Sequence, residues 1–207
     1  MSNNLNTVGI SLGMKCDSAI WGTVAGIRET KKNGYKTCPF DEMISNLPGI
    51  IQCLRDDFKY FCDPEYLCLI FSGSEYFIYN KRYRFIFNHE SPGHDNLFKT
   101  QNWREGMTHY INNNYAHFIT RYNKRITSYR EYLSNPNNFI SFILMRYNTY
   151  QLNLEELKLA ITSNYPYLKF HIIILSNNNT HEIKNTLKLL QFTDEENEVS
   201  RLNFWYG

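Results

Sequence analysis

Nearly continuous apolar runs alternate with amphipathic stretches in the last third of the chain. The apolar runs predict strands that are buried on both faces, and the amphipathic stretches have the spacing of helices. Asn153 is the expected N-cap of the first of these helices. The expected strands are residues 139–145, 169–175 and 199–206, and the expected helices between them are 153–165 and 180–190. This β-α-β-α-β order predicts a parallel sheet with helices on its faces.

A further apolar run, residues 8–12, ends in Gly13, and a cysteine follows three residues later. We interpret the run as a strand of the same sheet, Gly13 as a tight turn, and Asp17 or Ser18 as the cap of a helix that runs to about Ile27. The thiol of Cys16 then lies where a strand meets a helix N-terminus, at which unpaired N–H groups and the helix dipole favour a thiolate. Cys16 is either a reactive nucleophile or a small buried hydrophobe.

The middle of the chain predicts helices and an antiparallel insertion. Its expected elements are a helix over 48–61, a strand over 66–71, a β-hairpin around 75–88 and a long helical region over 103–133. The chain has 207 residues, enough for one full hydrophobic core, and it shows no internal repeat or long linker. The expected fold class is therefore α/β: a single domain over 1–207, with a mainly parallel sheet flanked by helices and a β-hairpin insertion.

A rigid corner follows the first helix. Pro39 restricts Cys38 to extended geometry, and Phe40 is expected to anchor the corner in the core. Asp41 comes next and has two interpretations: it caps a following helix, or it lies buried beside the loop of Cys16 and accepts hydrogen bonds there.

The hairpin leads into a segment rich in turn-forming residues, 88–96, which contains His89, His94 and Asp95. A loop of this composition on a rigid hairpin is a frequent position for functional residues, although a solvated loop with incidental histidines has the same composition. Arg125 either belongs to a solvated basic face or binds a carboxylate or phosphate. Arg146 ends its strand at the edge of the sheet where α/β proteins bind ligands.

Composition narrows the classes of partner and compartment. A net charge of +2 is too small to indicate nucleic acid or an anionic membrane as partner. The N-terminal residues have no signal-peptide pattern and no run spans a bilayer, so a cytoplasmic protein, in the host cell if viral, is expected. Five cysteines without a CxxC pair fit reduced thiols. No cofactor or metal is expected, although six histidines could supply ligands. The oligomeric state stays open.

Several motifs occur in a fixed order along residues 7–176. They are Ser11-Leu12-Gly13-x-x-Cys16, Pro39-Phe40-Asp41, His94-Asp95, Tyr122-x-x-Arg125-Ile126 and the strand end Phe142-Ile143-Leu144-Met145-Arg146. This order resembles a family of proteins from bacteria and large DNA viruses that is labelled putative papain-like cysteine peptidases. The first two motifs at this separation are its most specific part.

The resemblance implies that Cys16 is a nucleophile and His94 its base, with Asp95 or Asp41 orienting the imidazole. His89 is the rival base, because Asn96 stands where the family has an aromatic residue after His-Asp. In this chemistry the thiolate attacks an acyl carbon, and backbone N–H groups from Gly13 to Asp17 stabilise the oxyanion. The substrate is a peptide or another acyl compound, and Gly13, Asp17, Arg125 and Arg146 are the expected substrate-binding residues.

Two alternatives stay open. Papain-like enzymes place the cysteine on a helix and the histidine on a following antiparallel sheet, whereas a nucleophile directly after the first strand of a parallel sheet is similar to GDSL-type esterases. The second alternative is a non-catalytic α/β binding module, in which the Pro39-Phe40-Asp41 corner and Arg125 hold a glycan, a nucleotide or a protein partner.

Overall fold

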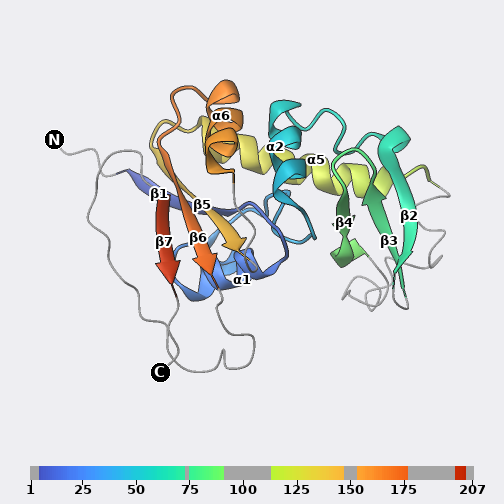
Figure 1. Ribbon diagram of the computed structural model, residues 1–207, viewed down its shortest axis with the longest axis horizontal. Coiled ribbons are helices and arrows are strands. Elements are labelled where there is room, and N and C mark those ends of the chain that lie inside the picture. The colour runs from blue at the N-terminus through green and yellow to red at the C-terminus, as the bar shows by residue number, and fades with distance from the viewer. Residues whose placement is uncertain (1–4, 73–74, 91–112, 147–152, 177–198, 204–207) are drawn as a thin grey trace.

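Four parallel strands form the larger sheet of the protein, whose computed structural model describes residues 5–72, 75–90, 113–146, 153–176 and 199–203 (Figure 1). The order in the sheet is β1-β5-β6-β7. These strands are β1 (Asn6–Ser11), β5 (Asn138–Arg146), β6 (Phe170–Ser176) and β7 (Val199–Asn203). In the register, Ile10 lies beside Phe142 and Ile143 beside Ile173. The predicted parallel sheet and α/β class are therefore confirmed.

Helices cover both faces of this sheet, because β5 and β6 are apolar on both sides. Helix α1 (Asp17–Val24) covers one face, where Ile143 and Leu175 belong to a small buried cluster. Gly22 lets α1 approach closely, since a Cβ there would lie 2.5 Å from Cδ1 of Ile143. The other helices lie across the sheet from α1, and their apolar side chains join the main core (Figure 1). They are α2 (Leu47–Arg55), α5 (Ala116–Ser134) and α6 (Leu154–Asn164).

A three-stranded antiparallel sheet lies beyond α2 and α5, in the order β2-β3-β4 (Figure 1). Its strands are β2 (Leu67–Ser72), β3 (Glu75–Asn80) and β4 (Phe85–Phe87). The predicted hairpin around 75–88 is β3 and β4, and the apolar run at 66–71 supplies the third strand. Short 3-10 helices complete the described elements: η1 (Lys31–Asn33), η2 (Pro64–Tyr66) and η3 (Asn88–Glu90).

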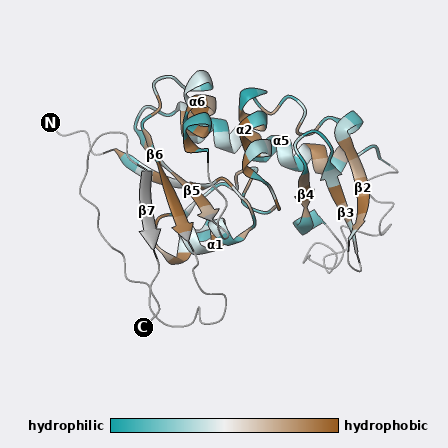
Figure 2. Cartoon of the chain, in the orientation of Figure 1, coloured by the Kyte–Doolittle hydropathy of each residue, from teal (hydrophilic) through white to brown (hydrophobic). Residues whose placement is uncertain are grey.

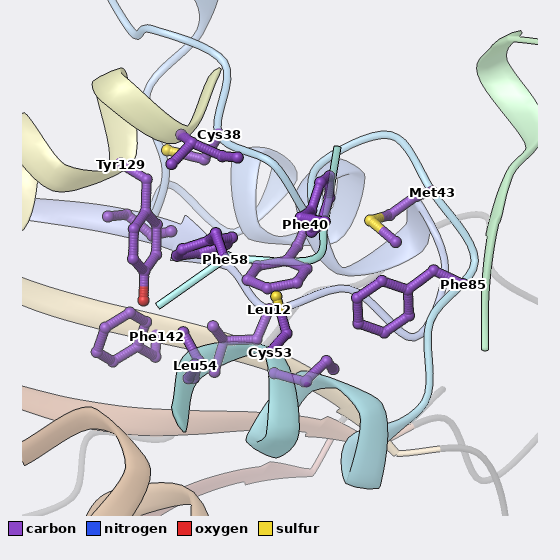
Figure 3. Close-up of a cluster of buried hydrophobic side chains, with 14 of the residues drawn as sticks. Leu12, Cys38, Phe40, Met43, Cys53, Leu54, Phe58, Phe85, Tyr129 and Phe142 are labelled. Atoms are coloured by element: carbon purple, nitrogen blue, oxygen red, sulfur yellow. The ribbon is translucent and has the colours of Figure 1, made fainter. Parts of the chain in front are cut away.

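One aromatic core joins the two sheets. Phe40 is fully buried, and its ring contacts those of Phe58, Phe85 and Tyr129 at centroid distances of 5.8, 6.0 and 6.4 Å (Figure 3). Such tilted and edge-to-face pairs are the favoured geometry of aromatic rings. Phe40 therefore anchors the Pro39 corner, as the sequence predicted.

The hydropathy colouring shows apolar residues concentrated along β5, β6 and the antiparallel strands (Figure 2).

Two helix predictions need correction. Helix α1 ends at Val24 rather than residue 27, because Gly26 has a φ of +71°. Helix α2 ends at Arg55 rather than residue 61, and the backbone turns back on itself at Asp57 and Phe58, where φ is also positive. Residues 103–112 of the expected helical region over 103–133, and the expected helix over 180–190, lie outside the described residues. Within the part of the chain that the structure describes, no helix combines the length and apolar character needed to cross a membrane.

Candidate active site around Cys16

Cys16 occupies the N-cap position of α1. Its backbone has φ −59° and ψ −14°, and its carbonyl accepts hydrogen bonds from the N–H groups of Ala19 and Ile20 at 3.1 and 3.0 Å. The cap is therefore Cys16 itself rather than Asp17 or Ser18, and Asp17 is the first helical residue. The Cys16 side chain makes no capping hydrogen bond and is partly exposed. Cys16 therefore differs from Cys38 and Cys53, which are buried.

Hydroxyl groups fix the loop that leads to Cys16. The N–H of Gly13 donates to Oγ of Ser11 at 3.1 Å, and the hydroxyl of Ser18 donates to the carbonyl of Gly13 at 2.9 Å. The N–H of Met14 donates to Oγ of Ser45 at 2.6 Å. Gly13 and Met14 both have positive φ, +85° and +75°. Both N–H groups are therefore used within the loop itself.

The surroundings of Cys16 raise the pKa of its thiol. Burial is the largest cause, and the negative charges of Asp17 and Glu42 add to it. The backbone N–H of Cys16 and a hydrogen bond from the Asn88 side chain act in the opposite direction. The net effect keeps the thiol protonated at neutral pH, so nucleophilic attack by Cys16 requires a base that removes its proton.

The residue after Asn88 is a histidine. Asn88 and His89 belong to η3, which directly follows β4, and Asn88 is 5% exposed. The positive charge of His89 is one of the influences that lower the pKa of Glu42. The turn that contacts the thiol therefore also carries a histidine within electrostatic range of Glu42.

Glu42 connects these groups. Its Oε2 accepts from Nη2 of Arg125 at 2.6 Å, and its Oε1 accepts from Nζ of Lys31 at 2.8 Å. Burial alone would raise the Glu42 pKa, but Arg125, Lys31 and His89 together lower it to about 2. Ile44, two residues later, pairs with Ile86 of β4, which holds this segment beside the strand that leads to His89. Glu42 is therefore an ionised carboxylate near both His89 and Cys16.

Sequence reasoning missed Glu42 and Asn88 as site residues. Glu42 directly follows the Pro39-Phe40-Asp41 corner, and Asn88 directly precedes His89. Adjacency to predicted site residues was the only signal in the sequence.

Asp41 is 2% exposed and caps no helix, so the cap interpretation is wrong. Its Oδ2 accepts from Nη2 of Arg28 at 3.0 Å, from the Tyr35 hydroxyl at 3.1 Å and from the N–H of Cys38 at 2.8 Å. Burial raises the Asp41 pKa, and Arg28 and the hydrogen bonds act against that effect. Asp41 is buried and accepts hydrogen bonds, as predicted, but the donors belong to Arg28, Tyr35 and Cys38 at the corner that precedes Glu42 rather than to the loop of Cys16.

The other predicted residues have different positions. His94 and Asp95 lie outside the described residues. Arg125 is 12% exposed and binds a carboxylate within the protein, that of Glu42. Arg146 is the last residue of β5, opposite Ser176. Among the residues that the structure describes, no cluster of three or more histidine, cysteine, aspartate or glutamate side chains could hold a metal ion.

The fold and this site define an α/β protein with a cysteine at a helix N-terminus and a histidine turn beside it. The family model described as putative papain-like cysteine peptidase (DUF1796) matches residues 7–180, and the chain belongs to that family. No curated protein and no solved structure matches the chain.

Proposed function

We propose that the protein is a cysteine-dependent hydrolase in which Cys16 is the nucleophile and His89 the base. The observation that carries the proposal is the position of η3: Asn88 hydrogen-bonds the thiol, and the next residue is a histidine. The family description supports the same chemistry at the level of class. The substrate class is a peptide or another acyl compound.

The reaction begins with a protonated thiol, because its surroundings raise its pKa. Neutral His89 removes the proton while the sulfur forms a bond to the acyl carbon, and the resulting oxyanion is stabilised by N–H donors at the start of α1. The imidazolium then protonates the leaving group as its bond to the acyl carbon breaks. Water attacks the thioester, gives its proton to His89, and releases the acid while the sulfur takes the proton back.

Glu42 is the acid that this arrangement favours as the partner of His89. It is ionised, and it acts electrostatically on the imidazole. Asp41 is less suited, because Arg28, Cys38 and Tyr35 rather than His89 are the groups that act on its carboxylate. His94 with Asp95 is the competing base and acid, and substitution distinguishes the two pairs.

The binding-module alternative rests on Asp41 and Arg125 as ligand-binding groups. Both side chains are engaged inside the protein, Asp41 with Arg28 and Arg125 with Glu42. Neither contact favours a bound glycan or nucleotide, so hydrolysis is the better supported function.

Alkylation with iodoacetamide at pH 7, followed by mass spectrometry of each cysteine, tests the proposal. Cys16 is expected to react first, whereas Cys38 and Cys53 are fully buried and burial raises the pKa of both. Replacing the base with alanine, as His89→Ala, should slow the alkylation of Cys16. The matched control is His117→Ala, an exposed histidine on α5.

The companion measurement is hydrolysis of a panel of fluorogenic peptide, amide and ester substrates. Cys16→Ser should abolish any activity and leave the thermal midpoint nearly unchanged, because the thiol is partly exposed. Slower alkylation in His94→Ala but not in His89→Ala would move the base to His94. Alkylation of Cys16 no faster than that of Cys68, together with no hydrolysis across the panel, would contradict the hydrolase.

A further inference from the structure

Two arginines one helical turn apart on α5 each bind a carboxylate from a different segment. Nη1 of Arg121 lies 2.8 and 2.7 Å from the two carboxylate oxygens of Glu90. Nη2 of Arg125 donates to Glu42 at 2.6 Å. Because residues four apart share a helix face, the same side of α5 holds η3 and the segment of Glu42.

The Glu90 carboxylate is 1% exposed, so its charge depends on protein groups rather than on water. Glu90 is the last residue of η3, and a 3-10 helix of three residues has little hydrogen bonding of its own to fix its orientation. On the other side of the turn, Phe87 packs on Phe118 and Tyr122 of α5 at 4.7 and 4.9 Å. Both ends of the Asn88–His89 pair are therefore attached to α5.

We propose that Arg121 is a positioning residue that acts through Glu90 to fix the Asn88–His89 turn beside Cys16. The inference rests on the proposed function. A buried ion pair adds little net stability compared with apolar side chains of the same size, but it holds its partners in a defined geometry. The geometry maintained here is that of the thiol and its base.

The test replaces both members of the pair in Arg121→Met/Glu90→Met, which leaves no unpaired buried charge. The readout is the rate of Cys16 alkylation from pH 5.5 to 9, with the thermal midpoint measured alongside. The rate of Cys16 alkylation at pH 7 is expected to fall about tenfold, which corresponds to a rise of one unit in the thiol pKa. It should then equal the rate in His89→Ala. Asp17 and Glu42 are the charged groups that otherwise act on Cys16, and this variant leaves both unchanged.

The matched control removes another ion pair, which joins Glu131 of α5 to Lys36, in Lys36→Met/Glu131→Met. That pair is exposed and lies away from η3, so the alkylation profile should equal the parent's. Glu90→Gln separates geometry from charge, because the amide oxygen still accepts from Arg121. Most of the parent rate should return in Glu90→Gln if the pair acts by position.

An unchanged Cys16 profile in the double variant, with an unchanged thermal midpoint, would overturn the inference. If the double variant does not fold, the single variants Glu90→Gln and Arg121→Lys provide the test. A parent rate of Cys16 alkylation in Glu90→Gln, together with a lower rate in Arg121→Lys, supports positioning. A lower rate in Glu90→Gln alone contradicts it. Failure of the proposed function has a different signature, since His89→Ala would then leave the Cys16 profile unchanged in the parent background.

Discussion

Arg28 and Asp41 form a buried ion pair, with Nη2 of Arg28 3.0 Å from Oδ2 of Asp41 and side chains 10% and 2% exposed. The guanidinium also lies over the Tyr35 ring, 4.0 Å from its centroid. The pair joins the segment after α1 to the corner that precedes Glu42. Asp41 of the Pro39-Phe40-Asp41 motif therefore stabilises the corner, and the next residue, Glu42, belongs to the candidate site around Cys16.

Asp41→Asn is expected to lower the free energy of unfolding by about 3 kcal/mol, because it leaves the Arg28 charge buried without an anion. Chemical denaturation at pH 7 measures the change. Glu131→Gln, which removes an exposed carboxylate, is the control and should leave the denaturation midpoint unchanged. A loss in Asp41→Asn no larger than in this control would show that the pair does not stabilise the corner.

Glu42 should make the protein sensitive to acid. The Glu42 pKa is lowered from 4.5 to about 2. The ionised carboxylate therefore contributes fully to the free energy of unfolding above about pH 4.5, and this contribution is lost as the pH falls toward 2. The full contribution is about 3 kcal/mol. In thermal scans from pH 7 to 2, Glu42→Gln should start below the parent and converge with it in acid. Two curves that stay parallel over this range would contradict the assignment.

Gly13 and Gly26 both have positive φ, +85° and +71°, but only Gly13 is crowded. A Cβ at Gly13 would collide with Oγ of Ser45, whereas nothing lies within 4 Å of one at Gly26. Gly26→Ala should therefore cost about 1 kcal/mol of backbone strain, and Gly13→Ala about 2 kcal/mol or more. Gly13→Ala should also slow Cys16 alkylation, as measured by mass spectrometry. Equal effects of the two substitutions would mean that the loop adapts to the added methyl group.

Asn88→Ala should raise the pH midpoint of Cys16 alkylation, because the Asn88 hydrogen bond lowers the thiol pKa. Rates measured from pH 6 to 10 give the midpoint, and Asn123→Ala on the exposed face of α5 is the control. A midpoint that does not move in Asn88→Ala would place the amide outside hydrogen-bonding range of the thiol in solution.

The sequence was sufficient for the parallel sheet because its strands are continuous apolar runs, and such runs indicate burial on both faces without tertiary information. The N-cap of α6 was equally readable: Oδ1 of Asn153 accepts from the N–H of Glu156 at 3.1 Å. Helix ends were less predictable. The end of α2 is followed by positive φ angles at Asp57 and Phe58, and the bulky side chain of Phe58 gives no local signal for such a backbone.

The site was only partly readable. The placement of Cys16 at a strand-to-helix turn followed from local spacing, but the contacts of Asn88 and Glu42 join segments far apart in the chain. Glu42 meets Arg125 across 83 positions, and no local pattern specifies such a pair. Asn88 belonged to a stretch whose composition is also that of a solvated loop, although it is buried.

The resemblance to papain-like enzymes predicts a cysteine on a helix and a histidine on an antiparallel sheet, whereas the apolar runs of the sequence predict a parallel α/β sheet. In this structure the cysteine and the histidine turn come from different sheets. The parallel sheet carries α1 with Cys16, and the antiparallel sheet leads into η3 with His89.

The one-turn spacing of Arg121 and Arg125 limits how the chain can vary in length. Each residue of a helix turns the next by about 100°, so one residue inserted between the two arginines would rotate one of them away from its carboxylate. An insertion before Arg121 or after Arg125 would leave their relative direction intact. Homologues that keep both pairs should therefore tolerate length changes in the connections around α5 but none within these five residues.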